Sequence, residues 1–150
     1  MVCPTVKVGF GYFNNFRFMR FLFKVQKQRM QIEGAPLSAP FLEVKIADSF
    51  ITRFAGLMLR KKLLPATALL LAPCNSVHMC FMRFAIDVVY LDKEYRILKI
   101  VKNLKPWIGL SMCSKACAVL EMTAGEAERC GCEVGKKLIM QSKQVYSKDT

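Results

Sequence analysis

The feature that most limits the fold of this chain is a succession of short apolar segments with no long helical pattern between them. The clearest two are residues 85–91 and 96–102, which are rich in β-branched and aromatic side chains and flank the polar turn 92–95. Two such segments around a short turn predict a β-hairpin. Because a parallel sheet needs long crossover connections, which this pattern lacks, the sheet is expected to be mostly antiparallel.

The remaining segments complete the expected architecture. Further strands are predicted at residues 41–47, 68–72, 76–82, 117–122 and 136–140. A short helix should begin at Asp48 or Ser49 and end at Gly56. A second should begin with a capping box formed by Thr123 and Glu126, and end at Gly131. The prediction is a mainly β fold, α+β by content: a compact antiparallel β sandwich or barrel with two short helices.

The length and composition favour one domain with extensions. The 150 residues are 53% hydrophobic, enough for a single packed core. We expect a globular domain at residues 41–140, preceded by an extension and linker at residues 1–40 and followed by a polar tail at residues 141–150.

Residues 13–30 mix aromatic and basic side chains at helical spacing, typical of a helix on an anionic membrane surface. The favoured interpretation is nevertheless that residues 1–29 pack loosely or not at all, or that translation starts at Met30.

The charge is strongly positive. Lys and Arg number 23 against 11 Asp and Glu, a formal net charge of +12, which favours an acidic partner such as lipid headgroups, nucleic acid or a protein. Residues 1–40 carry six basic residues and one acidic residue, a net +5, so the rest carries +7. Because some of the remaining arginines are expected to pair with acids of the domain, nucleic acid is the less favoured partner.

The chain has no clear signal peptide or transmembrane helix. Residues 63–82 are free of charged residues other than His78, but Pro65 and Pro73 interrupt them. We therefore expect a cytoplasmic location, with membrane association as an alternative.

The seven cysteines form no C-x-x-C pair, so neither a metal nor a cofactor is predicted. A redox or metal site at His78, Cys113 and Cys117 is a less favoured alternative.

Two acids interrupt apolar strands and single out a candidate site. Asp87 and Glu121 must each face water or find a partner, because an isolated buried carboxylate is costly. Nearby arginines could pair with them, and the only histidine could join them. The predicted site is a polar cleft suited to a small anionic ligand, formed by Arg53, Arg60, His78, Arg83, Asp87 and Glu121.

Five motifs in fixed order carry a family resemblance. They are the segments at residues 53–60, 73–78, 81–92, 103–107 and 119–125. Together they resemble the bacterial and archaeal domain-of-unknown-function family numbered 192, over about residues 41–140. The resemblance implies a compact, mainly β domain and no established activity. The recurrent positions of that family fall on Arg53, Gly56, Met58, Met82, Arg83, Asp87, Leu120, Glu121 and Gly125, and its usual proline is Ala85 here.

These observations leave three functional hypotheses. The leading one is a non-catalytic binding or accessory module that uses the polar cleft for a small anionic ligand or a protein partner. The second is a hydrolase-like enzyme using His78 with Asp87 or Glu121. The third is a protein that associates with an anionic membrane surface through residues 13–29.

Overall fold

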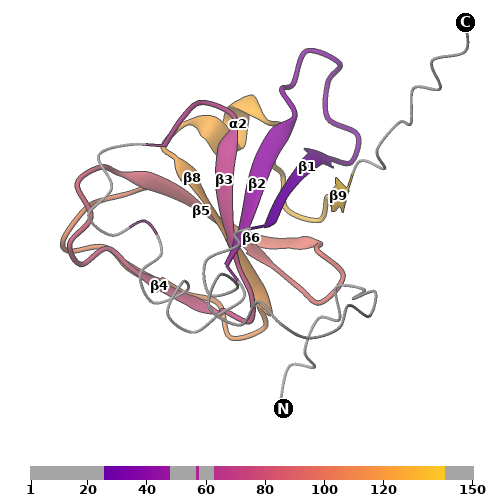
Figure 1. Cartoon of the computed structure of the whole chain (residues 1–150). Coiled ribbons are helices and arrows are strands. Elements are labelled where there is room, and N and C mark those ends of the chain that lie inside the picture. Colours follow the sequence, from indigo (N-terminus) through magenta and orange to yellow (C-terminus); the bar gives the residue numbers. More distant parts are fainter. Residues whose placement is uncertain (1–25, 48–56, 58–62, 141–150) are drawn as a thin grey trace, which may run out of the picture.

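A computed structural model describes residues 26–47, 57 and 63–140, and strands account for most of their regular structure (Figure 1). The elements in chain order are β1 (Gln26–Ile32), β2 (Leu42–Ala47), β3 (Thr67–Leu71), β4 (Ser76–His78), β5 (Ile86–Leu91), β6 (Ile97–Leu104), β7 (Leu110–Met112), β8 (Ala118–Thr123), α2 (Glu126–Arg129) and β9 (Leu138–Met140). The prediction of a mainly β fold is confirmed.

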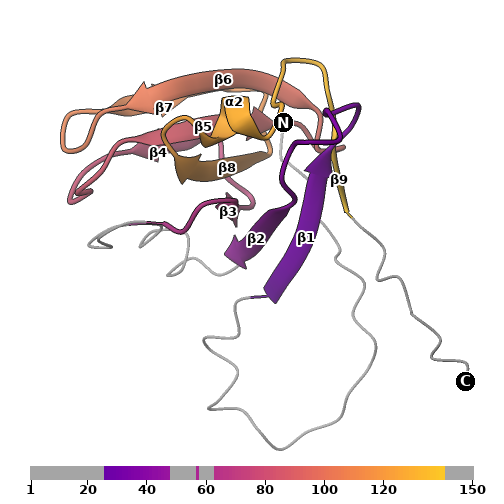
Figure 2. The same cartoon turned by 90° about the horizontal axis from the view of Figure 1, so that it is seen from above.

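The strands form one large sheet and one small one. The large sheet has the order β6-β5-β8-β3-β2-β1-β9 and curls into a half-barrel, while β4 and β7 form a two-stranded sheet (Figures 1 and 2). Neighbouring strands are antiparallel except for β2 and β3, which run parallel. The predicted hairpin is confirmed as β5 and β6.

Strand β5 lies at the centre of the core because both of its faces are covered. All six of its residues are buried. Since side chains alternate along a strand, Val89 and Leu91 pack into one apolar cluster, whereas Val88 and Tyr90 pack into a second. The first cluster lies toward α2 and β1, and the second lies toward the small sheet. A continuous apolar run in the sequence therefore corresponds to a strand covered on both sides.

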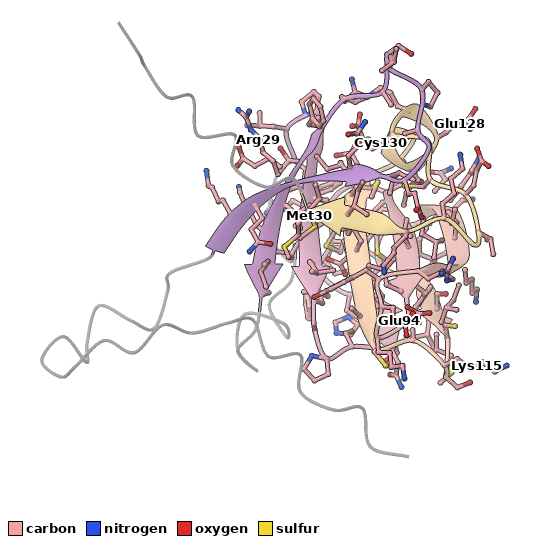
Figure 3. The ribbon with its side chains drawn as sticks, turned by 90° about the vertical axis from the view of Figure 1, so that its right-hand side faces the viewer. Arg29, Met30, Glu94, Lys115, Glu128 and Cys130 are labelled. Atoms are coloured by element: carbon pink, nitrogen blue, oxygen red, sulfur yellow. The ribbon has the colours of Figure 1, made fainter. Side chains whose placement is uncertain are left out.

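Residues 26–32 correct the expected start of the domain. They form β1, which pairs with β2 on one side and β9 on the other, so the helix expected through residue 30 is wrong for this part. Met30 and Ile32 are buried while Arg29 is exposed, which is the alternation of a strand (Figure 3). The sheet thus begins well before residue 41. Residues 13–25 of the expected helix lie outside the described residues.

The start of α2 also differs from the prediction. Gly125, with φ 90°, is the N-cap residue, and no side-chain hydrogen bond of its own caps the helix. The Thr123 hydroxyl is buried without a hydrogen-bond partner among the described residues, so the expected capping box is wrong. Glu126 instead accepts a hydrogen bond from the backbone N–H of Ala66 at 2.8 Å. The predicted end is confirmed, because Gly131 follows the helix with φ 73°.

Three other elements differ from the expectation. Strand β7 was not predicted, and the segment expected at residues 76–82 is a strand only from Ser76 to His78. Strand β9 is shorter than expected and begins at Leu138. The first of the two expected helices, at residues 48–56, lies outside the described residues.

Candidate functional site

Asp87 is buried and its carboxylate is occupied by backbone groups. Its side chain is 1% exposed on β5. Oδ1 accepts a hydrogen bond from the N–H of Asn103 at 2.9 Å, while Oδ2 accepts from the N–H groups of Gly125 at 2.8 Å and Ala127 at 3.1 Å. The carboxylate therefore caps α2 from a neighbouring strand and compensates the free energy cost of its own burial.

An irregularity in the β5–β6 hairpin positions Asn103, the hydrogen-bond partner of Asp87 on β6. The pairing of β5 with β6 shifts register between Ile86 and Val88. Asn103 lies at the shift with φ 54°, a left-handed conformation that Asn adopts more readily than most residues. Its N–H is thereby directed to Asp87. Asp87 thus ties together β5, the bulge of β6 and the start of α2.

Glu121 lies on the other face of the sheet. In the pairing of β5 with β8, Glu121 is opposite Val88, whereas Asp87 is opposite Met122. Because directly opposed residues point to the same face, Asp87 and Glu121 point to opposite faces. The two carboxyl groups therefore do not share one cleft and cannot act together as a general acid and base.

Burial dominates the chemistry of Glu121. Its side chain is 5% exposed, and Oε2 has no hydrogen-bond partner among the described residues. This burial raises the pKa of the carboxyl to about 7, since the charged form is poorly solvated there. Tyr90 shares this face, and burial also raises the pKa of its hydroxyl. Ser111, on the inner side of β7, is the polar neighbour of that hydroxyl.

The other predicted residues lie elsewhere. His78 is exposed on β4, where it pairs with Leu110, and its neighbour Val77 faces the core instead. Arg83 is exposed in the connection between β4 and β5. Arg53 and Arg60 lie outside the described residues. The four described residues do not gather in one polar cleft. Asp87 faces the α2 side and Glu121 faces the second apolar cluster, whereas His78 and Arg83 are on the surface.

An exposed apolar surface lies at the end of the small sheet, and we call it the apolar tip. It comprises Phe81, Trp107, Ile108, Leu110 and Met112. Ile108 is 81% exposed, Leu110 76% and Trp107 58%. The loops that follow β4 and β6 carry Phe81 and Trp107, and they lie together at the left-hand edge in Figures 1 and 2. The rings of these two residues meet edge to face, with centroids 5.6 Å apart.

Backbone hydrogen bonds hold the loops of the tip together. The N–H of Trp107 donates to the carbonyl of Met79 at 2.8 Å, and the N–H of Met79 donates to the carbonyl of Gly109 at 2.9 Å. A side chain at Gly109 would collide with the Lys105 carbonyl oxygen at 2.6 Å, so only glycine fits this turn. The tip is therefore a folded structure whose apolar side chains are exposed.

Backbone strain accompanies this exposure. Phe81 has φ 61° and Trp107 has φ 68°, left-handed conformations that are unfavourable for aromatic residues. Such strain tends to persist at functional sites, where the surrounding structure holds it in place. This surface was not predicted from the sequence. Its only signals were apolar residues around Gly109 in a segment without a clear strand pattern.

The described residues offer little support for a metal centre. Within them, no three His, Cys, Asp or Glu side chains gather as a metal site would require. Cys130 and Cys132 are buried free thiols, and burial raises their pKa values to about 11 and about 12. Cys80 is an exposed free thiol. No helix in the described ranges is long and apolar enough to span a membrane.

The curled sheet, the small second sheet and the ordered motifs define a class of small, mainly β domain. The chain belongs to the family described as "DUF192: Uncharacterized ACR", whose model matches residues 30–140. The resemblance inferred from the motifs is therefore confirmed, and the family has no characterised activity. Strand β1 ends within the matched range, in agreement with its place in the sheet.

Named relatives and solved structures agree with this assignment. The chain is 38% identical to a UPF0127 protein of Pyrococcus horikoshii over 102 residues, which cover 64% of this chain and 85% of the relative. It is also 38% identical to a UPF0127 protein of Pyrococcus furiosus, over 65% of this chain and 85% of the relative.

The crystal structure of a protein of unknown function from Novosphingobium aromaticivorans is similar with a TM-score of 0.68 at 21% identity, covering 77% of this chain and 86% of that one. The structure of a putative transcription regulator from Sinorhizobium meliloti is similar with a TM-score of 0.68 at 22% identity, covering 77% and 95%. At these identities the similarity concerns the fold alone.

Proposed function

We propose that this protein is a non-catalytic binding module whose binding surface is the apolar tip. The observation that carries the proposal is the exposure of five large apolar side chains, three on tightly hydrogen-bonded loops and two on β7. Adjacent exposed apolar side chains are unfavourable in water, and a folded patch of them is typical of an interaction site.

The placement of the acids favours binding over hydrolysis. A hydrolase-like site would need His78 close to Asp87 or Glu121. Asp87 already accepts three backbone hydrogen bonds, and Glu121 faces the core while His78 is exposed. These positions support a structural role for Asp87 and leave the binding hypothesis as the better one.

The charges around the tip support an anionic ligand. Arg83 lies two residues from Phe81, and Lys105 lies two residues before Trp107. Both are exposed, and neither forms an ion pair with another described residue. An apolar centre with a basic border matches a ligand that is apolar and carries negative charge. The proposal therefore assigns Arg83 to the border of a surface site and not to a cleft.

A fluorescent probe of this chemistry tests the proposal. Anilinonaphthalene sulfonate is apolar and anionic, and Trp107 is the only tryptophan of the chain. We expect saturable dye binding with energy transfer from Trp107 to the dye. Replacing Ile108 and Leu110 by Ser should weaken the binding about tenfold or more, because two apolar contacts are lost.

A matched variant controls for surface hydrophobicity. Leu37 and Val134 are also exposed, but they belong to neither the small sheet nor its loops. Replacing both by Ser should leave dye binding unchanged. The urea midpoints of both variants should stay near that of the wild type, which excludes dye binding to a loosened core. Equal dye affinity in the wild type and the Ile108→Ser, Leu110→Ser variant would overturn the proposal.

A further inference from the structure

We propose that the partner of the apolar tip is the surface of an anionic lipid bilayer, into which Trp107 and Ile108 insert. This inference rests on the binding function proposed above and names its partner. It concerns a different part of the molecule from residues 13–29, which the sequence alone had suggested for membrane contact.

The shape of the tip favours a bilayer over a protein partner. Trp107 and Ile108 are consecutive at a tight turn, which is closed by hydrogen bonds from Ile108 to Pro106 and from Gly109 to Lys105. A side chain that is 81% exposed, as Ile108 is, stands away from the protein instead of lining a hollow. Protruding apolar side chains can enter the boundary between headgroups and acyl chains, where Trp is especially favourable.

The small sheet extends the apolar surface behind this turn. Leu110 is paired with His78, and Met112 is paired with Ser76. All four residues are exposed, and residues two apart on a strand share a face, so they form the outer face of the sheet. Lys99 donates a hydrogen bond from Nζ to the carbonyl of Met112 at 3.1 Å, which fastens β7 to β6. Strand β7, which follows the inserted turn, is therefore held by both β4 and β6.

The distribution of charge complements an anionic surface. Residues 76–115 contain seven Lys and Arg and three acids, a net charge of +4. Of the acids, Asp87 is buried, while Asp92 and Glu94 lie in the turn at the other end of the β5–β6 hairpin. At the end of the tip, Lys105 and Arg83 remain exposed. Basic side chains beside an anionic leaflet contribute favourably to binding, and added salt weakens this contribution.

The acids of α2 do not oppose this attraction strongly. Glu126 pairs with Arg129 at 2.6 Å, and Glu128 pairs with Lys102 at 2.8 Å. Both acids of α2 therefore have a basic partner. Among the described residues of the tip loops, Arg83 and Lys105 are exposed basic side chains outside any ion pair.

Vesicle binding by the full chain tests the inference. The probes are vesicles of phosphatidylcholine with and without phosphatidylserine, and vesicles whose acyl chains carry bromine. Because Trp107 is the only tryptophan, its emission should shift to shorter wavelength on phosphatidylserine vesicles, and bromine should quench it. Replacing Ile108 and Leu110 by Ser should weaken binding about tenfold or more.

Two further variants separate the contributions. Replacing Arg83 and Lys105 by Ser should weaken binding and reduce its dependence on salt concentration. Replacing Arg17, Arg20 and Lys24 by Ser tests the segment at residues 13–29, and it should leave the quenching of Trp107 by bromine in place. The Leu37→Ser, Val134→Ser variant should bind as the wild type does.

The outcomes distinguish this inference from the function on which it rests. If the dye binds at the tip but bromine does not quench Trp107, the lipid partner is overturned, the binding function stands and a protein becomes the better partner. If neither probe binds, both proposals fail. If vesicle binding persists in the Ile108→Ser, Leu110→Ser variant and is lost in the variant of residues 17, 20 and 24, the membrane contact belongs to the segment 13–29.

Discussion

At the scale of single residues, Glu121 is the group whose burial has the largest consequence for pH dependence. Its pKa rises from 4.5 to about 7 because the side chain is removed from water. The folded-state pKa is thus above the unfolded one, so the protonated carboxyl stabilises the fold relative to the charged one. This contribution is fully present below pH 4.5 and is lost as the pH rises through 7.

We predict that the free energy of unfolding falls by about 3 kcal/mol across this window, since each pKa unit corresponds to about 1.4 kcal/mol. The Glu121→Gln variant should lose most of this dependence, because the amide has similar size and does not ionise. Urea unfolding on both sides of the window measures the effect. Glu94→Gln, at an exposed turn residue, should keep the wild-type profile. An unchanged slope in Glu121→Gln would show that another group titrates.

Asp87 gives a prediction about stability. Its carboxylate accepts three backbone hydrogen bonds in a buried position, and an amide in its place would direct its own donor toward backbone N–H groups. We expect Asp87→Asn to lower the free energy of unfolding by about 2–4 kcal/mol.

Asp92→Asn is the matched control for this experiment. The Asp92 carboxylate also accepts backbone hydrogen bonds, from Glu94 and Arg96, but these bonds are exposed to solvent. Its replacement should cost about 1 kcal/mol or less. Equal losses in the two variants, measured by urea unfolding, would contradict the role of Asp87 as a buried support.

The site residues show how far a sequence can be interpreted. A buried acid in an apolar strand needs a partner, and Asp87 has one, although the sequence suggested a place in a ligand-binding cleft. The partners expected were arginines, whereas the observed ones are backbone N–H groups at sequence separations of 16, 38 and 40 residues. Backbone groups carry no sequence signal, so these contacts could not be predicted.

At the scale of elements, β1 was not predicted because of the residues that precede it. The alternation of buried and exposed residues in β1 extends over only a few positions, and the aromatic and basic residues before it suggest a helical spacing. The hairpin of β5 and β6 was predictable because its turn and β-branched residues are local signals. The order of the seven-stranded sheet was not, because neighbours such as β3 and β8 are far apart in sequence.

The role of β1 can be tested by truncation. A chain that starts at Met30 loses the pairs from Gln26–Ile46 to Arg29–Glu43, and also the ion pair of Lys27 with Glu43 at 3.1 Å. We expect a free energy of unfolding about 2 kcal/mol or more below that of a chain starting at Gln26, since several backbone hydrogen bonds are lost. The urea midpoints measure this difference. Equal midpoints would mean that the first half of β1 contributes nothing to the fold.

At the scale of the whole molecule, the two faces of the large sheet pack against different parts of the chain. One face packs with α2, β1 and β9, and Asp87 fastens this side. The other packs against the small sheet, which presents the apolar tip outward. Glu121, the residue with the raised pKa, therefore lies beneath the surface proposed to bind lipid, while Asp87 lies on the opposite side of the sheet.

The carboxylate of Asp87 also determines the order in which parts of the chain can become stable. A helix of four residues, such as α2, does not persist in isolation, and its first amides are held by a residue about 40 positions earlier. Strand β5 must therefore be in place before α2 can hold its shape. The amide protons of Asn103, Gly125 and Ala127 are consequently shielded by one group, and they should exchange with solvent together, as a single cooperative unit of the native state.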